Sequence, residues 1–200
     1  RLAYVTAAEA KDSNVARSLR TNAEDYKTGM GCDLLIYTDE GQSQKLASNA
    51  TVMAWLEQNA ARYGFVIRYP ADKAEKTGVA EYTEYYRYVG VPHATYMKAN
   101  NLCLEEYLVL LRTYTSKDRL SIQALDGKTY EVYYCAVAGD GSISCPTNYN
   151  YTVSGTNEGG VVVTIDRSVV ANQPIYTDNA QSATEPATVP ESASESQTTP

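Results

Sequence analysis

The aromatic side chains of this chain are almost all tyrosines, with 18 Tyr beside one Phe and one Trp. A tyrosine ring brings a large apolar area, but it ends in a hydroxyl group that needs a partner or water when it is buried. A core built from tyrosines therefore favours half-buried strands and wet binding surfaces over a uniformly apolar interior. Hydrophobic residues make up 44% of the 200 residues, which is enough for one sizeable core and a smaller additional part.

The charge balance and the histidine count exclude several classes of protein. The chain carries 17 basic and 24 acidic residues, a formal net charge of −7, and no Lys/Arg cluster that would follow nucleic-acid phosphates. We therefore expect no nucleic-acid partner. No apolar run approaches the roughly 18 residues that a membrane-spanning helix needs. The single His excludes any site within this chain that requires two or three imidazoles.

The hydrophobic pattern changes character at residue 120. Before it, short apolar runs predict strands, and longer segments with helical periodicity predict helices. The expected strands are 2–6, 34–37, 65–69 and 85–89, and the expected helices are 49–63, 92–99 and 104–111. From residue 120 on, turns separate segments that predict only strands, at 120–124, 130–137, 149–154 and 160–165. We therefore predict a mixed α and β core that is followed by a small β appendage.

The composition changes again near the end of the sequence. Residues 177–200 contain no aromatic residue and no Lys or Arg, and Ser, Thr, Ala, Pro and Glu dominate them. Such a segment cannot bury enough apolar area to offset its conformational entropy. We predict a core over residues 1–115, a β appendage packed on it over 116–170, and a disordered tail or linker over 171–200.

The four cysteines form no CxxC pair, which together with one His argues against a zinc finger. Cys135 and Cys145 flank a Gly-Asp-Gly turn symmetrically about Asp140. In a β-hairpin this symmetry places two residues opposite each other and within disulfide reach. We therefore predict a Cys135–Cys145 disulfide, with two unpaired thiols as the alternative. Cys32 and Cys103 carry no such local argument.

Four stretches in order along the chain carry a family resemblance. They are WLEQNAARYGFVIRYP at 55–70, a Lys with the Thr-Gly pair that follows it at 77–78, RYVG at 87–90, and NNLCLEEYL at 100–108. With these motifs, residues 5–170 resemble the VanY-type D-alanyl-D-alanine carboxypeptidases, bacterial zinc peptidases that trim the terminal D-Ala from peptidoglycan stem peptides. The resemblance implies their α+β (VanY/hedgehog-like) fold, an antiparallel sheet packed by helices, here with a C-terminal β appendage.

The catalytic motifs of that family are altered in this chain. Its S-x-H-x-x-G-x-A-x-D motif aligns with residues 24–33, so Tyr26 stands at a ligand His position and Asp33 at the ligand Asp position. Its E-P-W-H motif aligns with residues 82–85, so Tyr82 stands at the general base and Tyr85 at the last ligand His. A catalytic zinc needs about three protein ligands, and a phenol with a pKa near 10 would have to ionise to bind it. We therefore predict no cofactor, because the zinc that the family uses is expected to be lost.

Four further residues are candidates for functional groups. Glu81 and Glu84 flank the second altered motif and are expected to be solvated, with a displaced calcium or magnesium site as the alternative. Glu84 alternates away from Tyr85 if the segment is a strand. His93 opens a predicted helix, and we expect a surface or capping residue rather than a ligand. Trp55 is expected to anchor the core through its helix.

The altered positions leave two interpretations open. The three tyrosines fill the former cavity and stabilise the fold, or they line a cleft that still binds a peptide or glycan, since tyrosine offers rigid area with one polar group. The predicted cleft lining is Tyr26, Asp33, Tyr82, Glu84 and Tyr85.

The favoured function is a catalytically inactive pseudo-peptidase of the bacterial cell envelope that binds a peptidoglycan stem peptide or an envelope protein. One alternative is an active D,D-carboxypeptidase that hydrolyses the terminal D-Ala of stem peptides. Another is a purely structural surface or adhesion module. The resemblance, the predicted disulfide and the tail composition together imply a secreted or cell-surface location.

Overall fold

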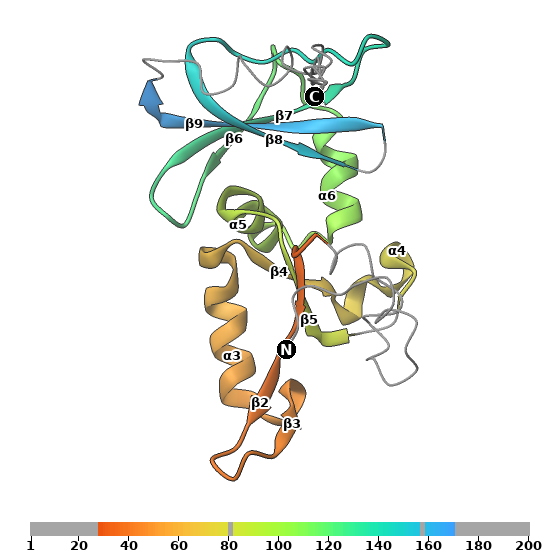
Figure 1. The fold of residues 1–200 in the computed structure, drawn as a ribbon, viewed down its shortest axis with the longest axis vertical. Helices are drawn as coiled ribbons and strands as arrows, with labels where there is room; N and C mark the ends of the chain where they lie inside the picture. Colours follow the sequence, from red (N-terminus) through yellow and green to blue (C-terminus); the bar gives the residue numbers. More distant parts are fainter. Residues whose placement is uncertain (1–27, 80–81, 157–158, 171–200) are drawn as a thin grey trace, which may run out of the picture.

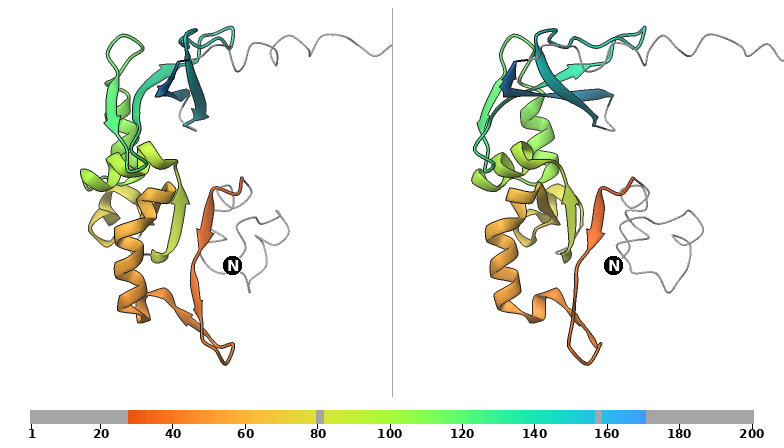
Figure 2. Two further views of the ribbon diagram at one scale, coloured as in Figure 1. Left: turned by 90° about the vertical axis from the view of Figure 1, so that its left-hand side faces the viewer. Right: turned by 60° about the vertical axis from the view of Figure 1, so that its left-hand side comes forward.

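The computed structural model describes residues 28–79, 82–156 and 159–170. The predicted strand at 2–6, Tyr26, Glu81 and the tail at 171–200 lie outside the described residues. Within the described ranges the chain forms two antiparallel sheets of three and four strands and a separate two-stranded hairpin (Figure 1). In both views of Figure 2 the helices α5 and α6 lie between the two larger sheets.

The first sheet has the strand order β1-β5-β4. Its strands are β1 (Gly31–Asp33), β4 (Phe65–Tyr69) and β5 (Tyr82–Tyr88), and the hairpin is formed by β2 (Leu35–Tyr37) and β3 (Ser43–Lys45). The predicted strands at 34–37, 65–69 and 85–89 are therefore present. The strands β1 and β3 were missed because Gly-Cys-Asp and Ser-Gln-Lys contain no apolar run that would signal a strand.

The second sheet has the strand order β6-β7-β9-β8. Its strands are β6 (Leu120–Gln123), β7 (Thr129–Ala136), β8 (Tyr149–Gly155) and β9 (Gly160–Val170). All four were predicted from the sequence, each to within a few residues at its ends. The pairing order was not predicted, and it determines the surroundings of the cysteines described below.

The predicted helices are present in the first part of the chain. They are α3 (Ala50–Asn59), α5 (Val91–Ala99) and α6 (Leu104–Leu111), joined by the one-turn α4 (Ala74–Thr77) and the 3₁₀ turns η2 (Leu46–Ser48), η3 (Ala60–Tyr63) and η4 (Ala71–Lys73). The side chain of Asn49 accepts the N–H of Val52 at 3.1 Å and caps α3. Gly64 ends η3 in the left-handed conformation, with φ of 81°.

A common core joins the helices to the second sheet. Tyr107 and Leu111 of α6 and Met97 of α5 are buried against apolar residues of that sheet. The sheet residues in this cluster are Leu120, Ile122, Val132 and Val162. Burial of this shared apolar area stabilises the packing of the appendage on the rest of the chain.

An ion pair fastens the first sheet to α6. The guanidinium of Arg68 on β4 donates from both of its terminal nitrogens to the two carboxylate oxygens of Glu105, at 3.1 and 2.6 Å. Such a two-pronged contact fixes both side chains in one geometry. The first sheet and α6 are therefore held together by charge as well as by packing.

The predicted role of Trp55 as a core anchor is wrong. Its side chain is 53% exposed and stacks on the exposed ring of Tyr63, with the ring centres 6.4 Å apart. The half-buried side of α3 is formed by Val52, Met53 and Leu56, and Trp55 lies at the edge of this stripe. Neighbouring elements bury only part of the surface of α3. The periodicity of the sequence does not predict how much of a helix surface its neighbours bury.

Candidate functional site

The candidate site is built on β1 and β5, where Asp33 and Tyr85 are direct partners in the antiparallel pairing. Asp33 is 1% exposed and Tyr85 is 0% exposed. Opposite residues of an antiparallel pair project from the same face of the sheet. The fold thus brings together two of the positions that the resemblance assigns to metal ligands.

Two more tyrosine rings surround Tyr85. Tyr69 of β4 stacks on it with the ring centres 5.7 Å apart, and Tyr82 lies 6.4 Å from it in a tilted arrangement. Regular alternation would place Tyr82 and Tyr85 on opposite faces of β5. The β4–β5 pairing shifts register between Ile67 and Tyr69, and this irregularity lets the two rings approach. We call Tyr69, Tyr82 and Tyr85 the tyrosine group.

Gly31 makes room for the tyrosine group. A Cβ atom at this position would overlap with the hydroxyl end of the Tyr85 ring, so the ring passes directly over the glycine backbone. Gly31 and Tyr69 were not among the predicted site residues. Both lie beside or inside the quoted motifs, but only the strand pairing reveals that they touch Tyr85.

Glu84 is half-buried on β5, next to Tyr85. Its backbone carbonyl accepts the N–H of Leu34 at 2.8 Å, which extends the contact between the two strands beyond Asp33. Tyr26, the remaining predicted lining residue, lies outside the described residues. The structure therefore brings Asp33, Tyr82 and Tyr85 together and places Glu84 beside them in the chain.

The opposite face of the same sheet carries Tyr86, whose strand partner is Cys32. Burial raises the pKa of Tyr86 to about 12 and also raises the pKa of the Cys32 thiol. The Tyr86 hydroxyl has no hydrogen-bond partner within the described part of the chain. Both groups are therefore neutral at pH 7 and belong to the packed side of the sheet.

His93 is not the surface or capping residue that the sequence predicted. It is partly buried, with Nδ1 2.8 Å from the hydroxyl of Tyr107 and Nε2 2.9 Å from the hydroxyl of Thr164. Desolvation lowers the pKa of His93 to about 4, so the ring is neutral at pH 7. The imidazole links α5, α6 and β9, and packing from three separate elements creates this site.

The residues present do not fit the zinc that the resemblance implies. Across the described ranges, no three His, Cys, Asp or Glu side chains gather into a group that would hold a metal ion. Beside Asp33 stands the phenol of Tyr85, and both ring nitrogens of His93 have partners elsewhere. One carboxylate with protonated phenols falls short of the donor set of a catalytic zinc site.

The predicted Cys135–Cys145 disulfide is not present, since both residues are free thiols in the structure. The expected hairpin does not form either, because β7 ends at Ala136 and residues 142–148 form no strand beside it. Cys135 is instead opposite Val161 of β9. Symmetry about the turn therefore does not set the pairing of Cys135, because the segment that carries Cys145 forms no strand.

The two thiols nevertheless share one environment. Cys135 and Cys145 both pack against the buried cluster of Tyr133, Val163 and Ile165. The backbone N–H of Ser144 points to the sulfur of Cys135 at 3.5 Å. The chain thus brings the two cysteines into the same part of the second sheet without bonding them.

The family model for the VanY D-alanyl-D-alanine carboxypeptidases matches residues 4–91. A D-alanyl-D-alanine carboxypeptidase of Enterococcus faecium is 39% identical over 127 residues, which cover 64% of this chain and 41% of the relative. A second, from Enterococcus faecalis, is 53% identical over 57 residues, which cover 28% of this chain and 21% of the relative. The chain thus spans less than half the length of either relative.

A solved structure agrees with these matches. The vancomycin-resistance D,D-dipeptidase VanXYg, in complex with a D-Ala-D-Ala phosphinate analogue, superposes with a TM-score of 0.67 at 29% identity. The match covers 82% of this chain and 71% of VanXYg, so it extends well beyond the residues of the family model. This confirms the predicted α+β fold class. By motifs, sequence and fold, the chain is similar to the VanY-type D-alanyl-D-alanine carboxypeptidases, and its residues 4–91 match the model of that family.

Proposed function

We propose that this chain is a catalytically inactive member of the family, which binds a peptidoglycan stem peptide or a cell-envelope protein without cleaving it. One observation carries the proposal. The only His in the chain uses both ring nitrogens in contacts with Tyr107 and Thr164, so no imidazole is available beside Asp33. The site therefore lacks the nitrogen donors that the family chemistry requires.

The remaining residues supply no substitute for that chemistry. Without a bound metal there is no Lewis acid to polarise an amide and no water of lowered pKa to attack it. Tyr82 at the base position is a phenol, which does not accept a proton near pH 7 as a carboxylate does. We propose instead that a ligand contacts Tyr82, the least buried ring of the tyrosine group, while the buried rings of Tyr69 and Tyr85 support it from below.

A peptide ligand is supported by the comparison with VanXYg, whose structure holds a D-Ala-D-Ala phosphinate analogue. We extend this to a peptidoglycan stem peptide for the present chain, and to a location at the bacterial cell surface or outside the cell. Among the described residues, no helix is both long and apolar enough to cross a membrane.

The test combines activity with binding. The purified chain is incubated with zinc and a stem peptide ending in D-Ala-D-Ala, and released D-Ala is measured by mass spectrometry. We expect no release, while insoluble peptidoglycan retains the chain in a pull-down. Turnover that a chelator abolishes would overturn the proposal, and a chain that neither cleaves nor binds would favour a structural or adhesion module.

The second candidate function is an active D,D-carboxypeptidase. It is supported by the relative from Enterococcus faecium, which bears that name and is 39% identical over 127 residues. The same incubation separates the two functions, since the active enzyme releases D-Ala in proportion to time and protein concentration.

A further inference from the structure

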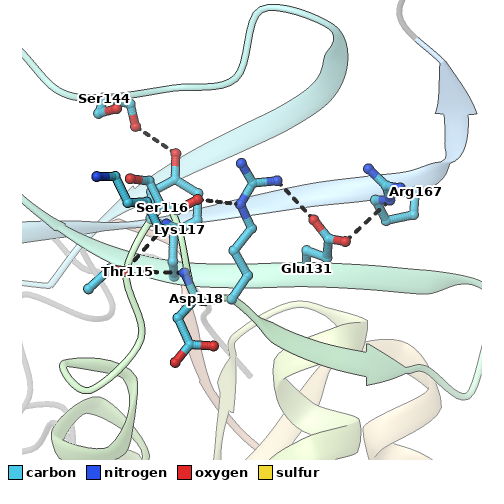
Figure 3. Close-up of polar contacts among 9 residues, drawn as sticks. Thr115, Ser116, Lys117, Asp118, Glu131, Ser144 and Arg167 are labelled. Atoms are coloured by element: carbon cyan, nitrogen blue, oxygen red, sulfur yellow. Dashed lines mark hydrogen bonds and ion pairs between the residues drawn. The ribbon is translucent and has the colours of Figure 1, made fainter.

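A second polar site lies on the four-stranded sheet, which does not include Asp33 or the tyrosine group. An open cavity of about 300 Å³ is lined by residues of the segment that precedes β6, by one residue of β6 and by one residue of β7. Figure 3 shows the polar contacts around it. The lining residues are Ser116, Lys117, Arg119, Ser121 and Glu131. We call this cavity the β6–β7 pocket. All five lining residues are polar or charged, and the volume is at the lower end of the range for ligand sites.

Arg119 is held in one orientation at this pocket. Its Nε donates to the backbone carbonyl of Ser116 at 2.8 Å, and its Nη1 donates to Glu131 at 2.9 Å. The guanidinium also lies over the ring of Tyr133, 5.6 Å from the ring centre. Its Nη2 has no partner among the residues that the structure describes. The free edge of the guanidinium is therefore positioned before any ligand arrives, which lowers the entropy cost of binding.

A second guanidinium offsets the charge of Glu131. The second carboxylate oxygen of Glu131 lies 3.4 Å from Nε of Arg167, and Arg167 stacks on the ring of Tyr149 at 4.1 Å. Glu131 therefore contacts both guanidinium groups, and Figure 3 shows its contact with Arg167. With Glu131 neutralised in this way, Lys117 and Arg119 leave the pocket positively charged on a chain whose net charge is −7.

The unused groups of the pocket are donors that suit an anion. Besides Nη2 of Arg119, the ammonium of Lys117 and the hydroxyls of Ser116 and Ser121 have no partners within the described ranges. Guanidinium and ammonium groups bind carboxylates through charge-assisted hydrogen bonds. The negative charge of the whole chain disfavours a polyanion. The stem peptide of the proposed function carries single carboxylates, which match these donors.

We propose that the β6–β7 pocket binds a side carboxylate of an acidic peptide. The inference rests on the proposed function, because it gives the stem peptide a second point of contact on the appendage. Lys117 and Arg119 would hold the carboxylate, and the serine hydroxyls would complete its hydrogen bonds.

The experiment compares two probes by calorimetry with the full chain. One is a stem pentapeptide with a free carboxylate on its glutamyl residue, and the other is the same peptide with that group as a carboxamide. We expect the carboxamide to bind about tenfold more weakly, which corresponds to the loss of one charge-assisted contact. Equal affinity of the two peptides would overturn the proposal for the pocket while leaving peptide binding in place.

Two matched variants locate the contact. Lys117→Gln removes an exposed charge that has no partner among the described residues. We expect this variant to bind the peptide with the free carboxylate about fivefold to tenfold more weakly than the wild type does. Lys128→Gln makes the same charge change in the turn between β6 and β7, where Lys128 pairs with Asp166 outside the pocket, and we expect no change in affinity. Equal losses in both variants would show a general charge effect and refute the pocket.

If neither stem peptide binds, the proposed binding of a stem peptide is refuted. A smaller probe then tests the β6–β7 pocket alone. N-acetylglutamate is titrated into the isotope-labelled chain at millimolar concentration. We expect amide shift changes at residues 116–121 that disappear in Lys117→Gln. Shifts that are absent, or that persist in the variant, would overturn the carboxylate site.

Discussion

Asp33 on β1 and Tyr85 on β5 face each other across an antiparallel pair, and both are fully buried. The register places the carboxylate position and a former imidazole position of the family side by side. A phenol now fills the second position, and it stacks on Tyr69 and touches Tyr82. The backbone thus brings together two positions that the resemblance assigns to metal ligands, and a carboxylate and a phenol occupy them.

Restoring the donor atoms is expected to restore metal binding. The triple change Tyr26→His, Tyr82→Glu, Tyr85→His supplies two imidazoles for Asp33 and a carboxylate base. We expect about one zinc per chain by elemental analysis after dialysis, against no stoichiometric zinc in the wild type. Adding Asp33→Asn to the triple variant is the control and is expected to weaken zinc binding. One tight zinc in the wild-type chain would contradict the proposed loss of the site.

Gly31→Ala is expected to destabilise the chain by about 1–3 kcal/mol. The new methyl group overlaps with the hydroxyl end of Tyr85, and the packed sheet leaves that ring little space to move. Urea unfolding followed by circular dichroism measures the change. Gly155→Ala is the matched control, because that strand glycine has open space at its Cβ position, and we expect a change within about 0.5 kcal/mol. Equal stability of the two variants would contradict the close contact between Tyr85 and Gly31.

The stability of the chain is expected to fall with acid through His93. Its folded pKa of about 4 lies below the ordinary value of 6.5, so between these values the unfolded chain binds more protons than the folded chain. The free energy of unfolding therefore rises with pH from 4 to 6.5, and His93 accounts for about 3 kcal/mol of this rise. Unfolding by urea at several pH values measures it.

His93→Gln is the control for this prediction, and its difference from the wild type isolates the contribution of one side chain. Because the chain has a single His, its imidazole resonance also gives the folded pKa directly by NMR titration. A measured pKa near 6.5 would show that the ring is solvated and that its contacts with Tyr107 and Thr164 do not persist in solution.

Mild oxidation is expected to bond Cys135 to Cys145. The two thiols pack on the same cluster around Tyr133, whereas Cys32 and Cys103 lie in or next to other elements, in β1 and just before α6. After treatment with diamide, we expect peptide mapping to find one intramolecular disulfide and two remaining thiols. In Cys145→Ser the bond is expected to be absent. Four free thiols after oxidation of the wild type would show that the two sulfurs do not come within bonding distance.

The sequence predicted the elements whose signals are local. The strand at Phe65–Tyr69 was readable from its apolar run and the following Pro70, and the helix after Asn49 from its cap and from Gly64. The apolar spacing of 104–111 likewise placed Tyr107 and Leu111 in the core. The family motifs also predicted which residues of β1 and β5 lie together in one site.

The side chains that this protein can use follow from its sequence, which has one imidazole, tyrosines at positions that the resemblance assigns to the catalytic groups, and a C-terminal part made of strands. The tertiary structure decided where they act, by pairing β7 with β9 and by packing α5 and α6 against the second sheet. These contacts placed Cys135 opposite Val161, left Trp55 exposed, and placed His93 between Tyr107 and Thr164. The physical reason is that each outcome depends on which distant segment covers a residue, and local periodicity carries no information about that choice.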